Sequence, residues 1–548
     1  MIFLRRKMAI AAAVILGIFV TLYLGGLIGQ LNAGYREWLS QDGLGGGAVM
    51  SGINFSPLRC VAYSLGANGR GVALSVVIIS AAVFVYAKLH DKFGKGERDE
   101  RNFTRAKEGT YGTAAWMSDK EMRQALEVAA PENAHGVILG EKNGKVICLP
   151  VSTKLNKHIF VCGASGAMKS RAIVRNLLFQ AIKRGESVVL TDSKAELYDN
   201  TAELFRQNGY LVKVFNLLVS PDHSDSWNCM ANLAGDTLTT QILTDVIISN
   251  TAKAPYNLFA QASDTVRAGI VLGLGTRLQI MQNEAIRRIT GHSDIDLAKP
   301  GKTKCAYFVI LSDQESSTEF LSSLFFSFLF IQLTGYADST PERRCAIPVN
   351  VVFEEFNNIG KLDSYPRRLS VARSREIQIC HVVQSLDQFQ NRYLKNEWAE
   401  IIGSCDTQLM LGVTEQEGAE FFSLRSGDST VRVNSTMTVK QTIALTQLVP
   451  QYRETDGIGR RRLLTPDEVL RFPNDELLII LRGQNVLRAR KFDYLEHPFA
   501  KRLILSSIFD YNPQLVPHTG SEEPDAPRTE MNPALAKLFA ASKPPDEF

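Results

Sequence analysis

The stretch HIFVCGASGAMKS, residues 158–170, decides the fold of this chain. It opens with a short apolar run that is typical of a buried strand and passes directly into a glycine-containing loop. The loop GASGAMKS, Gly163 to Ser170, approaches the pattern G-x-x-x-x-G-K-[ST], whose backbone N–H groups wrap a phosphate. Residues 169–183 follow with apolar side chains at helical spacing. Strand, loop and helix in this order predict a nucleotide site, because the helix N-terminus points its N–H groups and dipole at the phosphates.

One residue of the loop departs from the pattern, because Met168 stands where the last glycine is expected. Its N–H remains available, but methionine lacks glycine's freedom in φ, so we expect Met168 to fit with a negative φ and its side chain turned away. In such a site Lys169 reaches the β- and γ-phosphates of ATP and Ser170 ligates Mg²⁺. The predicted nucleotide-binding residues are Gly163, Ala164, Ser165, Gly166, Ala167, Met168, Lys169, Ser170 and Arg171.

Two later strands supply candidate catalytic residues. VNVVFEEFNNIG, residues 349–360, is an apolar run that ends in Glu354 and Glu355. In a phosphate-loop enzyme the first acid holds the Mg²⁺ shell, and the second orients or deprotonates the attacking water. Asp is usual at the first position, and two solvated acids at a strand end are the alternative interpretation. IQICHVVQS, residues 377–385, is a further buried strand, and its Gln384 is positioned to sense the γ-phosphate.

Eight short apolar runs alternate with helical segments, which predicts an α/β domain with a largely parallel sheet. The runs are residues 158–162, 187–192, 211–216, 305–310, 349–355, 377–384, 407–413 and 476–482. Residues 236–250 and 256–290 are predicted to be helices between the early and the late strands. The apolar run 320–333 is short and interrupted by serine, so a buried helix is expected there. The Pro- and acid-rich tail 511–548 is predicted to be disordered; its segment ALAKLFAA is the alternative, as a docking site for a partner.

Two uncharged segments predict a membrane anchor. Residues 8–29 are long enough to cross a hydrocarbon layer of about 30 Å, and residues 71–87 are shorter but also uncharged. Lys and Arg precede the first segment and follow the second, which predicts that both ends are cytoplasmic in the plasma membrane. A cleaved signal peptide is the rival interpretation of the first segment.

The overall composition excludes few functions. The 548 residues carry a net charge of +4, with 45% hydrophobic and 22% charged residues, which is normal for a folding chain of several domains. This charge neither supports nor excludes nucleic-acid binding. The eight cysteines form no C-x-x-C pair, and most lie in apolar runs, so we expect buried thiols in a reducing compartment. The scattered histidines indicate no metal cluster.

Several ordered motifs resemble the TraG/TraD-type coupling proteins of conjugative type IV secretion, relatives of HerA/FtsK-type DNA translocases. The likeness extends from the membrane pair to about Phe499. Its motifs are EGTYGTAAW (108–116), GASGAMKSR (163–171), LTDSKAELY (190–198), DSWNCMANL (225–233), FEEFNNIGKL (353–362), RSREIQICHVVQSLDQ (373–388), GSCDTQLMLG (403–412) and LTPDEVLRFPNDELLIILRGQ (464–484). Methionine in the loop is typical of Gram-positive members of this family, so the resemblance points to that branch.

The resemblance implies a membrane-anchored hexameric ATPase with a RecA-like motor domain that recruits a relaxase–DNA complex and passes it to the secretion channel. It implies the phosphate and Mg²⁺ roles for Lys169 and Ser170, the acid pair for Glu354 and Glu355, and the sensor role for Gln384. Arg373 and Arg375 are candidates for an arginine finger that acts on the neighbouring subunit, and a plain salt bridge is the alternative.

The family also inserts an all-α domain before the acid-pair strand, and in this chain that domain is expected to be reduced. The predicted domains are an anchor (1–95), the first part of the nucleotide-binding domain (96–235), a helical segment (236–300), the second part (301–510) and the tail (511–548).

Three functions remain open from the sequence. The first is an ATPase that pumps DNA. The second is a receptor or scaffold that binds nucleotide or relaxase without turnover, which Met168, Glu354 and the reduced all-α domain favour. The third is a motor for protein cargo. The helical region with Arg267, Arg277, Arg287 and Arg288 is a candidate pore lining for DNA, or an ordinary polar helix face.

Overall fold

The computed structural model describes residues 2–40, 53–66, 74, 103–104, 109–218, 221–230, 283–312, 318–362, 364–439 and 451–513. The chain divides into two units. The first comprises residues 1–108 and 430–459, and the second comprises residues 109–429 and 460–548. The second unit contains the loop at residues 163–170 and is the one that carries the candidate site.

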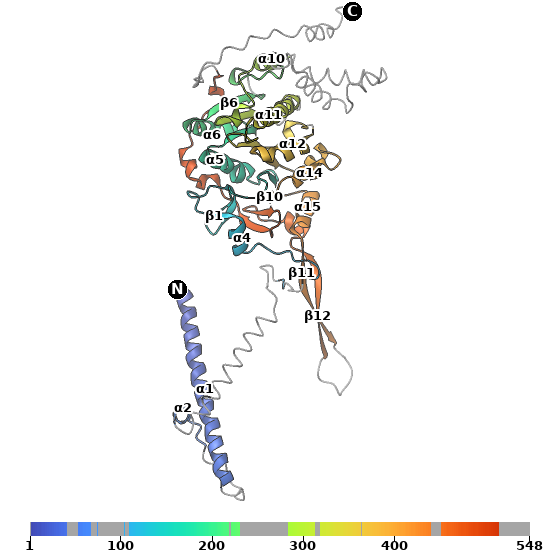
Figure 1. Cartoon of the computed structure of the whole chain (residues 1–548). Helices are drawn as coiled ribbons and strands as arrows, with labels where there is room; N and C mark the ends of the chain where they lie inside the picture. The colour runs from blue at the N-terminus through green and yellow to red at the C-terminus, as the bar shows by residue number, and fades with distance from the viewer. Residues whose placement is uncertain are drawn as a thin grey trace, which may run out of the picture. The chain divides into compact units, whose positions relative to one another are not determined.

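A single twelve-stranded sheet forms the centre of the second unit in the part of the chain that the structure describes (Figure 1). Its strands are β1 (Glu127–Ala129), β2 (Val137–Lys142), β3 (Lys145–Leu149), β4 (Ile159–Gly163), β5 (Ser187–Asp192), β6 (Leu211–Asn216), β7 (Cys305–Ile310), β8 (Val349–Phe353), β9 (Ile377–Val383), β10 (Thr407–Gly412), β13 (Glu476–Leu481) and β14 (Leu487–Arg490). The order is β1-β3-β2-β14-β13-β10-β4-β9-β8-β5-β7-β6.

The sheet is parallel from β10 to β6 and antiparallel in the remaining strands. All eight strands predicted from apolar runs are present, and the expectation of a largely parallel sheet is confirmed. The antiparallel extension through β14, β2, β3 and β1 was not predicted. The parallel order matters for function because it brings the carboxyl ends of β4, β9, β8 and β5 to one edge.

Helices cover both faces of the sheet (Figure 1). They are α4 (Asp119–Ala125), α5 (Arg175–Arg184), α6 (Glu196–Gln207), α10 (Glu284–Thr290), α11 (Glu319–Ser339), α12 (Tyr365–Ala372), α13 (Leu386–Arg392), α14 (Glu397–Gly403), α15 (Gln416–Ser426) and α16 (Pro466–Leu470). Alternate residues of β4 enter different hydrophobic clusters: Ile159 and Val161 pack with α5 and α6, whereas Phe160 and Cys162 pack with α11 and α13. The central strands are therefore buried on both sides, which explains their continuous apolar sequences.

Helix α11 confirms the expectation of a buried helix at residues 320–333. It is long and apolar enough to span a membrane, but 72% of its apolar window is buried inside the protein. It is therefore a core helix of the second unit. The eight cysteines are also buried, as predicted.

The first unit contains α1 (Ile2–Ser40), α2 (Pro57–Leu65) and most of a hairpin of β11 (Asp428–Val439) and β12 (Gln451–Arg462). Helix α1 includes the first predicted membrane segment, residues 8–29. The second segment, 71–87, lies outside the described residues apart from residue 74. The predicted helix 236–250, residues 256–282 of the next predicted helix and the tail beyond residue 513 also lie outside the described residues. The hairpin was not predicted.

Candidate functional site

The loop after β4 has the backbone form of a phosphate-binding loop. It is held at its start by the N–H of Ala164, which donates to the carbonyl of Gly412 at 2.9 Å. A Cβ at Gly163 would lie 3.1 Å from the Cβ of Leu411 and 3.2 Å from that of Ala167, so the close packing favours glycine there. Gly166 has a φ of +78°, which glycine adopts without strain.

Met168 also adopts a left-handed backbone, with a φ of +64°. The expectation of a negative φ was therefore wrong. A non-glycine residue in this region costs about 1–2 kcal/mol. The half-buried side chain packs against the hydrophobic cluster of α5 and α6, and this contact offsets part of the cost. The position thus has a left-handed backbone, which glycine would adopt without strain.

Lys169 and Ser170 follow at the start of the helix. The Nζ of Lys169 donates to the carbonyls of Gly163 at 2.8 Å and Ala164 at 3.2 Å. Burial lowers the pKa of Lys169, while the nearby carboxylates of Glu355 and Glu354 oppose this shift. Ser170 begins a wide helical turn, Ser170–Val174, that leads into α5. The ammonium group therefore lies over the loop itself.

Glu354 lies beside Ser170, as the predicted metal site requires. The Ser170 hydroxyl donates to the Oε1 of Glu354, and the Thr191 hydroxyl donates to the Glu354 carbonyl at 2.8 Å. Burial and the nearby Asp192 raise the pKa of Glu354 to about 7. Asp192 was missed by the sequence analysis. It is buried at the end of β5, where burial raises its pKa to about 6 although it accepts the N–H of Tyr198 at 2.8 Å.

The oxygen donors at this point fit Mg²⁺. Mg²⁺ is usually held by one or two carboxylates together with substrate phosphates and water, rather than by a full protein cage. Ser170 and Glu354 supply a hydroxyl and a carboxylate in contact with one another. Within the described residues, no group of three or more His, Cys, Asp and Glu side chains could hold a metal ion without a nucleotide.

Glu355 and Gln384 are brought together at the same edge of the sheet. The Nε2 of Gln384 donates to the Oε1 of Glu355 at 2.5 Å, and the Nδ2 of Asn358 donates to its Oε2 at 2.9 Å. Glu355 has a φ of +61°, which turns the chain sharply after β8. Both carboxylate oxygens are therefore held by neutral amide donors next to the loop.

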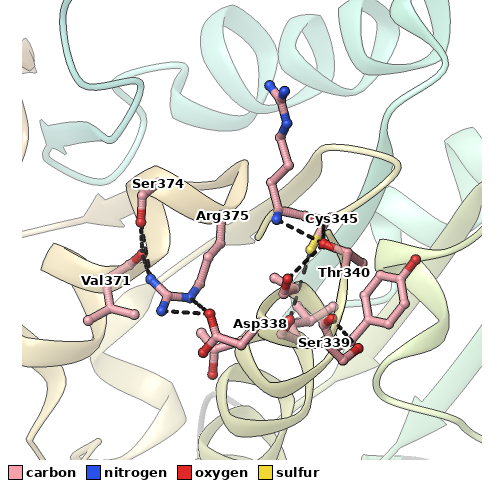
Figure 2. Close-up of polar contacts among 12 residues, drawn as sticks. Asp338, Ser339, Thr340, Cys345, Val371, Ser374 and Arg375 are labelled. Carbon is pink, nitrogen blue, oxygen red and sulfur yellow. Dashed lines mark hydrogen bonds and ion pairs between the residues drawn. The ribbon is translucent and has the colours of Figure 1, made fainter. Parts of the chain in front are cut away.

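Arg373 and Arg375 lie at the opposite end of β9 from Gln384. Seven residues of strand, about 20 Å at 3.3 Å per residue, separate the two ends. Arg375 donates to Asp338 through Nε at 2.9 Å and through Nη2 at 2.8 Å, as Figure 2 shows. Arg373 is exposed and donates to the carbonyl of Lys154 at 3.0 Å. Neither arginine belongs to the site of its own chain.

The remaining predicted residues are arginines, and the described ones form ion pairs or lie on α10. Arg171 leaves the loop and pairs with Asp493. Of the candidate pore arginines, Arg287 and Arg288 lie on α10, and Arg288 is ion-paired with Asp222 at 2.6 Å. Arg267 and Arg277 lie outside the described residues. The structure therefore gathers Lys169, Ser170, Glu354, Glu355 and Gln384, and the arginines stand apart.

Comparison with known proteins agrees with this fold. The conjugative coupling protein TrwBdeltaN70 in its unbound form has a TM-score of 0.52 at 15% identity, over 73% of this chain and 96% of that chain. The plasmid coupling protein TrwB in complex with the GTP analogue GDPNP has a TM-score of 0.51 at 16% identity, over 73% of this chain and 97% of that chain. The fold is therefore that of the TrwB coupling protein.

The family follows from the sequence match. The family model described as Type IV secretory system Conjugative DNA transfer matches residues 106–257 and 236–511, and the chain belongs to this family. Protein VirD4 of Rhizobium radiobacter is 22% identical over an alignment of 460 residues, which covers 72% of this chain. The chain spans 65% of the length of VirD4. This confirms the coupling-protein resemblance at the level of the family.

The φ of Met168 leads to a test of the loop. We expect Met168→Gly to keep the Kd for ATP within about threefold of wild type, because the backbone is already left-handed there. Met168→Ile should weaken binding by about tenfold or more, because a β-branched residue at positive φ is strongly strained. Calorimetric titration of both variants with MgATP checks this. A large gain in affinity from Met168→Gly would contradict it.

The raised pKa of Glu354 leads to a test of stability. Its folded pKa lies above that of the unfolded chain, so the group costs no stability below about pH 4.5 and an increasing amount as pH rises to about 7. Without nucleotide, Glu354→Gln should therefore be more stable than wild type by about 1–3 kcal/mol at pH 8. The gain should shrink toward pH 5.

Thermal unfolding at both pH values measures this difference. Glu355→Gln is the matched control, because its carboxylate is already held by two amide donors and its replacement should give no such gain. An equal gain at pH 5 and pH 8 from Glu354→Gln would show that ionisation is not the cause.

Proposed function

We propose that this chain is a membrane-anchored ATPase that recruits a relaxase–DNA complex and pumps DNA into a type IV secretion channel. The observation that carries the proposal is the convergence of Lys169, Ser170, Glu354, Glu355 and Gln384, which come from three different strands, at one sheet edge. Membership of the conjugative DNA transfer family supports the choice of DNA as cargo. The Gram-positive branch rests on Met168 alone.

The residues of the site divide the work of ATP hydrolysis. Loop N–H groups and the helix N-terminus bind the phosphates, and Lys169 exchanges its bonds to the loop carbonyls for the β- and γ-phosphates. Ser170 and Glu354 hold Mg²⁺, which neutralises charge that develops on the phosphates. Glu355 orients the attacking water and accepts its proton. When Gln384 turns to the γ-phosphate, it releases the Glu355 oxygen that it now occupies.

Arg373 is the better candidate for an arginine finger. Arg375 is engaged twice by Asp338 and also donates to the carbonyl of Val371, which supports a structural role (Figure 2). Arg373 is exposed at the strand end farthest from its own loop, where it is available to a neighbouring copy in a ring. We therefore propose a homo-hexamer in which Arg373 contacts the next subunit's nucleotide.

The membrane part of the proposal rests on the sequence. Helix α1 contains the uncharged segment 8–29, and positive residues flank the predicted pair of spans. We propose a multi-pass anchor in the plasma membrane with both termini in the cytoplasm. The five predicted domains, including a reduced all-α segment at residues 236–300, are retained as part of this proposal.

A non-hydrolysing receptor or scaffold is the second candidate. It is favoured by the hydrogen bonds of Lys169 to the loop carbonyls, which nucleotide binding has to break. It is also favoured by the pKa of Glu354, because a carboxyl that is partly protonated near pH 7 binds a cation less readily. Both candidate functions require a site for a nucleotide or a partner. Only the ATPase hydrolyses ATP, so an assay of hydrolysis distinguishes the two.

Phosphate release by the purified full chain tests the proposal. We expect Mg²⁺-dependent ATP hydrolysis that rises with added single-stranded DNA and falls at least about 100-fold in Lys169→Ala, because the lysine contacts the transferred phosphate. The stimulation by DNA should weaken as salt increases. Equal phosphate release by wild type and Lys169→Ala would instead support the scaffold.

The two strand-end arginines can be separated by the same assay. Arg373→Ala should lower DNA-stimulated turnover by about 100-fold or more while ATP binding is retained. Arg375→Ala should mainly lower the melting temperature, because it removes the pair with Asp338. Mixing Arg373→Ala subunits with Lys169→Ala subunits should restore part of the activity, since one intact site then forms across a subunit boundary. No restoration would argue against action in trans.

A further inference from the structure

A cluster of four side chains borders the loop on the helix side. Arg171 and Arg175 lie one turn apart, and they meet Asp493 and Tyr494 at the short helical turn Tyr494–Glu496. Arg171 pairs with Asp493 through Nη2. The guanidinium of Arg175 lies 4.9 Å from the centre of the Tyr494 ring, and that of Arg171 lies 5.9 Å from it. These four residues are called the Tyr494 cluster below.

The Tyr494 cluster lies directly beside the predicted phosphate site. Arg171 is the residue after Ser170, whose hydroxyl contacts Glu354. Arg175 is close enough to Glu354 for its positive charge to lower the pKa of that carboxyl, against the larger effect of burial. Arg175 is also within 3.7 Å of Glu196 at the start of α6. The Tyr494 cluster therefore begins one residue after the loop, next to the phosphates that the loop is proposed to hold.

The Tyr494 cluster has the chemistry of a base-binding surface. Nucleobases stack on aromatic rings and on guanidinium planes. Tyr494 is half-buried, and the side chain of Arg171 is 48% exposed, so both retain open surface. Arg175 is only 6% exposed and its Nε has no hydrogen-bond partner, which leaves one buried donor of the cluster unsatisfied. Buried donors are normally satisfied, so this one indicates a group that arrives with a ligand.

Anchoring of the C-terminal segment does not require the cluster. The same segment is attached to α5 by apolar contacts of Phe179, whose ring centre lies 5.0 Å from that of His497 and 6.2 Å from that of Phe499. Further along, the N–H of Ile508 donates to Asp199 of α6 at 2.8 Å. The polar groups at Arg171 and Asp493 are therefore additional to what holds this segment.

We propose that the Tyr494 cluster holds the nucleobase of the bound nucleoside triphosphate. Tyr494 and Arg171 stack against the base, and Asp493 keeps the Arg171 guanidinium beside the ring. This inference rests on the proposed function, because it requires a nucleotide whose phosphates lie in the loop. It assigns base contact to Arg171, which directly follows the loop, and to Tyr494, which lies far away in the sequence. The separation between Arg171 and Asp493, the residue before Tyr494, is 322 positions.

The test compares a ligand that has a base with one that lacks it. The full chain in detergent is titrated calorimetrically with MgATP and with magnesium tripolyphosphate. Tyr494→Leu keeps an apolar side chain against Phe179 but removes the ring. We expect it to weaken ATP binding about tenfold, as base stacking does elsewhere, and to change tripolyphosphate binding by less than about twofold.

Two control variants define the effect. Tyr494→Phe keeps the ring and should retain ATP binding within about threefold. Phe499→Leu removes another half-buried ring that contacts Phe179, but it does not border Arg171, so it should change neither titration. If Tyr494→Leu does not yield folded protein, Asp493→Asn releases Arg171 and should likewise weaken ATP but not tripolyphosphate.

The outcomes separate the inference from the function on which it rests. Equal weakening of both ligands by Tyr494→Leu, or no weakening of either, would overturn the base site while the phosphate site stands. Loss of ATP binding in Phe499→Leu to the same degree would also overturn it. If wild type binds neither ligand, or if Lys169→Ala binds both as well as wild type does, the proposed nucleotide site fails and the inference fails with it.

Discussion

The contact between Ser170 and Glu354 is the interaction on which the site depends, because it joins residues 184 positions apart. Their strands, β4 and β8, are not neighbours, since β9 lies between them. A carboxylate from β8 therefore has to reach across one strand to meet the first turn of the loop helix. Glutamate in place of the usual aspartate supplies one more methylene for that reach. The feature that looked like a departure from the pattern thus fits the geometry of this sheet.

The parts of the fold that could be predicted are the strands whose burial on both faces gives them continuous apolar sequences. The parallel strands β4 to β10 are covered on both faces, so most of their side chains are apolar and each run can be recognised in the sequence. The strands β1 and β14 are short and partly exposed, and their sequences contain no such run. Strand β3 is buried from Val146 to Leu149, and its apolar run was overlooked. A signal for β2 and β3 was nevertheless present, because Asn143 and Gly144 form a two-residue hairpin turn with φ values of +55° and +72°.

The site was predictable to the same extent and for a related reason. Lys169, Ser170, Glu354, Glu355 and Gln384 follow recognisable strands, and the carboxyl ends of parallel strands share one edge. Asp192 follows such a strand as well, and applying the same rule to β5 would have found it. The φ of Met168 and the pairing of Arg171 with Asp493 were not predictable, because neither backbone angle nor long-range side-chain contact is recorded in local sequence.

Ionisation of the buried carboxyl groups of Glu354 and Asp192 is unfavourable in the free protein. Glu354 and Asp192 both have raised pKa values, because burial opposes their ionisation, and the charge of Asp192 adds to this effect at Glu354. In the proposed function, a divalent cation held there with a nucleotide would favour the ionised form of these carboxyl groups. Lys169 behaves in the opposite sense, since burial lowers its pKa while the charges of Glu355 and Glu354 oppose that shift. If the chain binds MgATP as proposed, the phosphates would compensate the charge of Lys169 and Mg²⁺ would compensate that of the carboxylates.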